Sequence, residues 1–184
     1  ALARTAPVLG RRRGLMAEYF ATTADVHRLA GGLPRGADRL PAADNRSKSL
    51  ADSARRLARM VGADADAHSR RVWVGLARHL AALQLGQLHA AARRVLRSGR
   101  LGRRAPVVGA GVGRFVVRRL ARRLGRRYVD AGAVLARGAS GAAREGAARC
   151  LPAVAVALLA IARNAFATAA SRPGSSAPSR PARH

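Results

Sequence analysis

Two short apolar runs, separated by a glycine-rich loop and a helical stretch, constrain the fold of this chain more than any other feature. Residues 105–108 form the first run, residues 114–124 carry apolar side chains at every fourth position, and Tyr128 and Val129 form the second run. A strand–helix–strand order with short connections favours parallel pairing of the two strands. We therefore expect an α/β fold that is rich in helix.

Glycines 109, 111 and 113 occupy the turn between the first strand and the helix. Glycine there lets an anion approach the backbone amides at a helix N-terminus. Asp130 follows about 20 residues later, as in dinucleotide-binding proteins, but Arg114 occupies the position of that motif's third glycine, and no Lys-Ser or Lys-Thr completes a P-loop. Two interpretations remain open: a tight turn without a ligand, and a phosphate- or nucleotide-binding loop.

Helical periodicity predicts further helices over residues 49–61, 69–97 and 152–169. Ser49 is the expected N-cap of the first, and Val72, Leu76, Leu80 and Leu83 form the expected apolar stripe of the second. One short strand is expected within residues 1–15. The predicted organisation is a strand and polar-motif loop segment over 1–48, a helical insertion over 49–104, an α/β segment with the glycine loop over 105–170, and a disordered tail over 171–184.

The apolar stretch Leu151–Ala162 is shorter than the roughly 20 residues that a membrane span needs, so we expect a buried helix and no membrane partner. The single cysteine, Cys150, excludes an internal disulfide and favours a reducing compartment, here the cytoplasm. We expect Cys150 to be a small buried core residue.

The formal charge of +26 would ordinarily indicate nucleic acid or an anionic membrane as a partner. All of the 35 basic residues except Lys48 are arginine, however, and they are spread through every segment. That distribution is typical of a GC-rich coding sequence. We expect non-specific polyanion binding but no specific nucleic-acid partner, and an arginine-rich nucleic-acid-binding module stays an alternative.

Residues 16–29 gather several of the chain's rarer polar side chains. The segment contains two carboxylates, two adjacent hydroxyls and an imidazole: Glu18, Asp25, Thr22, Thr23 and His27. In one interpretation they mark a helix start, with Thr23 as N-cap. In the other, carboxylates and hydroxyls on a loop bind Mg²⁺ or a diphosphate held through Mg²⁺. His27 is expected to be a surface or packing residue.

Five blocks of the chain, in order, resemble one protein family. They are Met16–Val26, Pro41–Asp44 with Lys48, Ser53–Gly62, Val107–Phe115 and Cys150–Leu159. The family is that of the hydantoinase/oxoprolinase-like proteins of the tetrahydromethanopterin-linked one-carbon transfer pathway, which includes the condensing enzyme of methanofuran biosynthesis.

The resemblance implies the C-terminal part of an actin/sugar-kinase/Hsp70-like (ribonuclease-H-like) ATPase fold, with an N-terminal lobe as its partner. It also implies a transferase that joins an aminomethylfuran diphosphate to the phenol of γ-glutamyltyramine and releases diphosphate, with Mg²⁺ as cofactor. A related ATP-dependent hydrolase that opens a hydantoin or oxoproline ring is the alternative within the family. The oligomeric state and the metal ligands are not implied.

The family's motifs map onto nine positions of this sequence. The expected catalytic residues are Glu18 and Asp25. The expected substrate-binding residues are Thr22, Thr23, Asp44 and Lys48, and the expected phosphate- or nucleotide-binding residues are Gly109, Gly111 and Gly113. The chain lacks the family's Asp-Ile-Gly-Gly type loop, and Leu40 stands where the family's loop has histidine. We therefore expect this chain to hold only part of the site.

Overall fold

The computed structural model describes residues 2–99, 101–102 and 104–170, so the predicted tail over 171–184 lies outside the described residues. The fold is mixed α/β and rich in helix, as expected.

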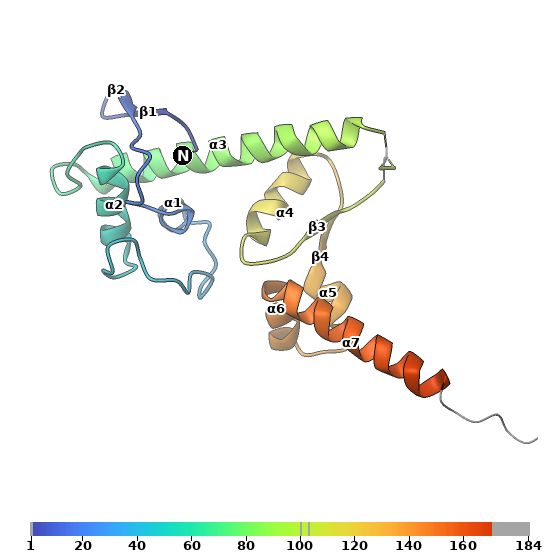
Figure 1. Cartoon of the computed structure of the whole chain (residues 1–184). Coiled ribbons are helices and arrows are strands. Elements are labelled where there is room, and N and C mark those ends of the chain that lie inside the picture. Colours follow the sequence, from blue (N-terminus) through green and yellow to red (C-terminus); the bar gives the residue numbers. More distant parts are fainter. Residues whose placement is uncertain (1, 100, 103, 171–184) are drawn as a thin grey trace, which may run out of the picture.

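The long helix α3 (Arg70–Arg97) runs along one side of the molecule (Figure 1). Near its N-terminal half lie β1 (Thr5–Val8), β2 (Arg11–Gly14), α1 (Thr23–Leu29) and α2 (Leu50–Arg59). Toward its C-terminal half lie β3 (Val107–Gly109), α4 (Arg114–Arg123) and β4 (Tyr128–Asp130), followed by α5 (Ala131–Leu135), α6 (Gly141–Arg149) and α7 (Leu151–Ala170).

The predicted strand–helix–strand unit is present, and its strands are parallel. Val107 pairs with Tyr128 and Gly109 pairs with Asp130, with α4 between the two strands in sequence. A side chain at Gly109 would overlap the ring of Tyr128, so close packing against the neighbouring strand explains this glycine.

Residues 5–14 form an antiparallel hairpin of two strands where one strand was expected. The turn at Leu9 and Gly10 has positive φ at both residues, 55° and 73°. Consecutive left-handed residues are what a two-residue hairpin turn requires, and a leucine at the first of them concealed the turn in the sequence.

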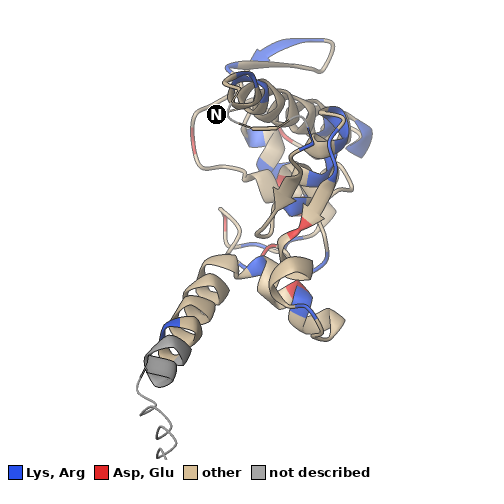
Figure 2. Ribbon diagram, turned by 90° about the vertical axis from the view of Figure 1, so that its right-hand side faces the viewer, with Lys and Arg blue, Asp and Glu red and all other residues tan. Residues whose placement is uncertain are grey.

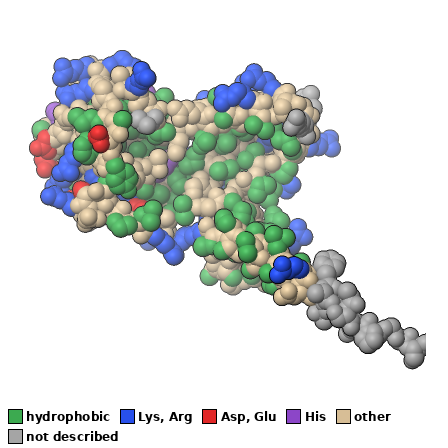
Figure 3. All heavy atoms as spheres, in the orientation of Figure 1, with side chains coloured by type: hydrophobic (Ala, Val, Ile, Leu, Met, Phe, Trp, Pro, Cys, Tyr) green, Lys and Arg blue, Asp and Glu red, His purple; other side chains and the backbone are tan. Residues whose placement is uncertain are grey.

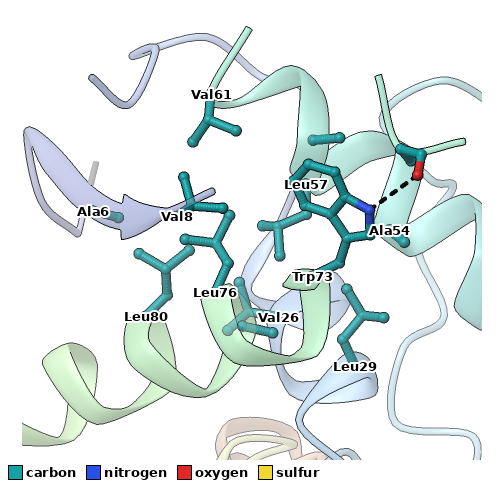
Figure 4. Close-up of a cluster of buried hydrophobic side chains, with 13 residues drawn as sticks. Ala6, Val8, Val26, Leu29, Ala54, Leu57, Val61, Trp73, Leu76 and Leu80 are labelled. Atoms are coloured by element: carbon teal, nitrogen blue, oxygen red, sulfur yellow. Dashed lines mark hydrogen bonds between the residues drawn. The ribbon is translucent and has the colours of Figure 1, made fainter. Parts of the chain in front are cut away.

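The main hydrophobic core lies between the hairpin, α1, α2 and α3 (Figure 4). Trp73 is its largest member, 1% exposed, and its indole nitrogen donates a hydrogen bond to the carbonyl of Ala65 at 3.2 Å. Leu76 and Leu80 are buried as predicted, whereas Val72 and Leu83 are only half-buried at its edge. Trp73 was missing from the predicted stripe because α3 buries a wider face, against several elements at once.

Two helix starts test the capping predictions. Ser49 is the N-cap of α2, as predicted, and its hydroxyl accepts a hydrogen bond from the Asp52 amide at 3.0 Å. The N-cap of α1 is Thr22, so the assignment of Thr23 was wrong by one residue. The cause is Asp25, whose carboxylate accepts a hydrogen bond from the Thr22 amide at 3.0 Å and fixes the helix start there.

The C-terminal helices correct two predictions. Cys150 is exposed, and so are most of the described side chains of α7: Val156, Leu159 and Ile161 are 67%, 71% and 65% exposed. The axis turns by 102° between α6 and α7, and α7 points away from the remainder of the molecule (Figure 1). The buried helix predicted for residues 151–162 is therefore wrong. Among the described residues no single helix has the length and apolarity to cross a membrane; only α6 and α7 taken together as a bent pair do.

Candidate functional site

A cavity of about 430 Å³ lies between α1, the loop over residues 31–48, α3 and the turn before α4. We call it the central cavity. Its lining is mostly apolar, and it brings Thr22, Thr23 and Asp25 of the polar segment next to Gly113 of the glycine loop. Figure 3 shows hydrophobic side chains gathered below α3 on the face toward the viewer. Two blocks from opposite halves of the sequence thus contribute to one site.

The two threonines of the polar segment differ in their hydrogen bonding. The Thr22 hydroxyl donates to Asp25 at 3.3 Å. The Thr23 side chain is exposed in the first turn of α1 and makes no hydrogen bond within the described part of the chain. Of the two threonines, Thr23 is therefore the one whose hydroxyl is available to a ligand.

Asp25 is 2% exposed, and both of its carboxylate oxygens are occupied. One oxygen accepts from Arg56 at 2.7 and 3.0 Å, from Ser53 at 2.9 Å and from Arg28 at 3.0 Å. Burial alone would raise the pKa of Asp25, but the hydrogen bonds from Arg56, the Thr22 amide and Ser53 outweigh it and lower the pKa. Asp25 is thus an ionised carboxylate that joins α1 to α2. A catalytic role for it remains a prediction.

Asp44 and Lys48 belong to the same group of charges, which we call the ion-pair cluster. Its members are Asp25, Asp38, Asp44, Arg28, Lys48 and Arg56. Arg56 binds Asp44 at 2.9 Å, and the Lys48 ammonium donates to the Asp38 carbonyl at 2.9 Å. Neither Asp44 nor Lys48 lines the central cavity. The cluster attaches the loop over residues 31–48 to α1 and α2.

Glu18 lies apart from Asp25. It is exposed and lines a smaller hollow of about 230 Å³ with Met16, Met60 and Leu80. The two predicted catalytic carboxylates therefore do not face the same space.

The three glycines of the predicted phosphate loop have different roles. The Gly111 amide donates to the Ala148 carbonyl at 2.7 Å, and its φ of +75° favours glycine. Gly113 is the N-cap of α4, and of the three glycines it alone lines the central cavity. The Asp130 carboxylate accepts from the Gly132 amide at 3.0 Å and pairs with Arg114 at 3.1 Å, so it caps α5.

His27 lies deeper in the site than its sequence position indicated. It is 4% exposed, its Nε2 lies 2.7 Å from the Gln84 Oε1, and its ring packs perpendicular to that of Phe115, with 4.9 Å between the ring centres. Its Nδ1 is buried and has no hydrogen-bond partner among the described residues. Burial lowers the pKa of His27, the charge of Arg119 lowers it further, and the hydrogen bond to Gln84 opposes both. Of the two predicted roles, surface residue or packing residue, the structure shows the packing residue. No sequence signal linked residue 27 to residues 84 and 115.

The described residues do not fit a Mg²⁺ site of their own. No three His, Cys, Asp or Glu side chains of the described chain are grouped so that they could hold a metal ion. The carboxylates of Asp25, Asp38 and Asp44 are each paired with arginine or lysine, which leaves few free oxygen ligands.

A second hollow of about 300 Å³, which we call the arginine hollow, shares a wall with the central cavity. The common wall consists of Ala37, Val112 and Phe115. Five arginines and one glutamate also line the hollow: Arg114, Arg118, Arg119, Arg122, Arg149 and Glu145. In Figure 2 the ribbon is blue wherever the chain has lysine or arginine. These arginines do not stand out in the sequence, because arginine is common in every segment of the chain.

No protein-family model matches this chain, and no curated protein is significantly similar to it.

Proposed function

We propose that the chain binds a phosphorylated small molecule in the central cavity, as part of a transferase that joins an aminomethylfuran diphosphate to the phenol of γ-glutamyltyramine. The observation that carries the proposal is the meeting of Thr22, Thr23 and Gly113 in one cavity. These residues belong to two of the blocks that resemble the family. The proposal includes the C-terminal part of an actin/sugar-kinase/Hsp70-like fold, with an N-terminal lobe that completes the site.

The lining of the cavity suits a ligand with a flat ring. Leu33, Phe115 and Val116 supply apolar and aromatic surface, and such surfaces bind ring systems by burial and stacking. The free Thr23 hydroxyl and the backbone at the start of α4 supply polar contacts. Helix N-termini favour anionic groups.

The chemistry that the proposal requires is removal of a proton from the phenol and neutralisation of a leaving diphosphate. Asp25 is a poor base, because its pKa is lowered and its oxygens are occupied. Its contribution to the site is to position Thr22 and Thr23 through the start of α1. Glu18 needs a partner surface to approach the same ligand, which the N-terminal lobe would provide.

Binding of ligand fragments to the cavity tests the proposal. We expect an aromatic amine such as tyramine, and a furfuryl diphosphate, to bind wild-type protein in a calorimetric titration. Gly113→Val should abolish this binding, because Gly113 lines the cavity, a Cβ there would have open space around it, and its φ of −82° is one that valine can adopt. Thr23→Ala should weaken it about three- to tenfold by removing one hydrogen bond. Gly146→Val, in open space on α6, is the control and should leave binding unchanged. Equal binding by wild type and Gly113→Val would overturn the proposal.

A nucleic-acid-binding module is the second candidate, and the arginines of α4 favour it. Five of the ten residues of α4 are arginine, within a chain of formal charge +26. This candidate predicts oligonucleotide binding that collapses between 50 and 200 mM salt, by roughly 10³-fold or more, and that ignores Gly113→Val.

A further inference from the structure

The arginine hollow is a strongly charged concave surface. Five guanidinium groups face a single carboxylate there, that of Glu145. Arg114 and Arg149 are both paired with Glu145. Arg118 lies over the ring of Tyr128, 4.9 Å from its centre. Arg119 and Arg122 make no ion pair with any described residue.

The hollow holds these arginines close together. Arg119 extends across the edge of the hollow, where a side chain at Gly32 would come within 3.1 Å of its Nη2. Arg118 and Arg122 are one helical turn apart on α4 and project from the same face. Positive charges that line one small hollow repel one another unless an anion lies between them. Guanidinium groups bind phosphate oxygens through paired hydrogen bonds, so a phosphate group is the anion that this arrangement suits.

We propose that the arginine hollow binds the phosphate groups of a small anionic ligand, through Arg119, Arg122 and Arg118. Its volume of about 300 Å³ and its concave shape suit a diphosphate better than a nucleic-acid strand, which needs an extended surface. The phosphate could belong to a free diphosphate, a diphosphate ester or a nucleotide.

The position of the hollow suggests how such a ligand would lie. Ala37, Val112 and Phe115 line both the hollow and the central cavity, so the two spaces adjoin. In the proposed arrangement the phosphate groups lie in the hollow and the organic part of the ligand lies beyond Phe115, in the cavity. The placement of the organic part of the ligand in the central cavity rests on the proposed function. The assignment of the phosphate site to the arginine hollow does not rest on it.

Titration of the full chain with sodium pyrophosphate, in the presence of EDTA to remove divalent metals, tests the proposal. We expect saturable binding to wild type. The double variant Arg119→Gln/Arg122→Gln should weaken it about tenfold or more, because two charge-assisted contacts are lost. The matched control is Arg93→Gln/Arg94→Gln, which removes the same charge from an exposed part of α3 and should change the affinity less than about threefold.

Three results would overturn the proposal: no saturable binding of pyrophosphate to wild type, equal weakening by the two double variants, or a preference for an oligonucleotide that both double variants weaken equally. Circular dichroism would show that both variants are folded, as expected for exposed side chains.

Gly113→Val separates this proposal from the proposed function. If it abolishes tyramine binding and leaves pyrophosphate binding unchanged, both proposals stand. If pyrophosphate binding depends on Arg119 and Arg122 but tyramine does not bind, only the phosphate site stands. Tighter binding of ADP than of pyrophosphate would support an organic group that extends into the cavity.

Discussion

At the scale of single residues, Asp25 and Arg56 form a buried ion pair in the N-terminal part of the molecule. Both side chains are almost completely buried, and their partners come from α1, α2 and the loop over residues 31–48. A buried ion pair adds little stability relative to an apolar pair, but removal of one partner leaves an uncompensated charge.

Arg56→Ala should therefore destabilise the protein by about 3–5 kcal/mol. The neighbouring Arg55 is 39% exposed and pairs with Asp52, so Arg55→Ala should cost less than about 1 kcal/mol. Urea unfolding of the two variants measures the difference. A similar loss in both would mean that the cluster does not stabilise the fold.

His27 should make stability depend on pH. Its pKa in the folded protein lies below the ordinary 6.5, so the unfolded state takes up a proton more readily. The contribution of His27 to the free energy of unfolding should therefore be fully present above pH 6.5. It should decrease as the pH falls below 6.5, and stop decreasing once the pH is below the pKa of His27 in the folded protein. Urea unfolding at pH 7.5 and 5.5 should show a smaller loss in His27→Gln than in wild type. An identical loss in the two proteins would contradict the assignment.

At the scale of elements, close packing of backbones determines where glycine is required. A side chain at Gly132 in α5 would overlap the Arg144 carbonyl and the Ala148 side chain in α6. Gly111, in the loop before α4, also donates its amide to the carbonyl of Ala148. The β3–α4 turn is therefore held in place by α6.

Gly132→Ala should destabilise the protein by about 1–3 kcal/mol, because a backbone carbonyl cannot rotate away as a side chain can. Gly146→Ala, in open space on α6, is the matched control and should be neutral or stabilising by up to about 1 kcal/mol. Thermal unfolding followed by circular dichroism compares the two. A neutral Gly132→Ala would show that α5 and α6 pack less closely than the structure indicates.

Local patterns in the sequence were sufficient to predict several elements. The parallel pair β3 and β4 followed from two apolar runs around a helical repeat, and the start of α2 followed from Ser49. The antiparallel hairpin did not, because its turn uses a leucine with positive φ. Helices α5 and α6 were missed because their small residues give a weak apolar repeat.

The candidate site was predictable in its residues but not in its geometry. Thr22, Thr23 and Gly113 were selected from sequence, yet nothing in the sequence indicated that they share a cavity. The arginine hollow depends on tertiary contacts between α4, α6 and the loop after α1, which local patterns do not encode.

At the scale of the whole molecule, burial is unevenly distributed. The core around Trp73 is well covered, whereas the described side chains of α7 are mostly exposed. Leu80→Ala should cost about 2–5 kcal/mol, and Leu159→Ala less than about 0.5 kcal/mol, although both remove the same atoms from a helix. Urea unfolding measures both. A large loss in Leu159→Ala would mean that α7 is covered in solution.

The length of α3 has a mechanical consequence for the central cavity. The helix has 28 residues, and it carries the contacts to α1 on one half and to α4 on the other. Residues of α1 and α4 line the cavity, so α3 is the helix that joins these two parts of its wall. Any bend in α3 between these two sets of contacts would therefore change the distance between α1 and α4, and with it the width of the cavity.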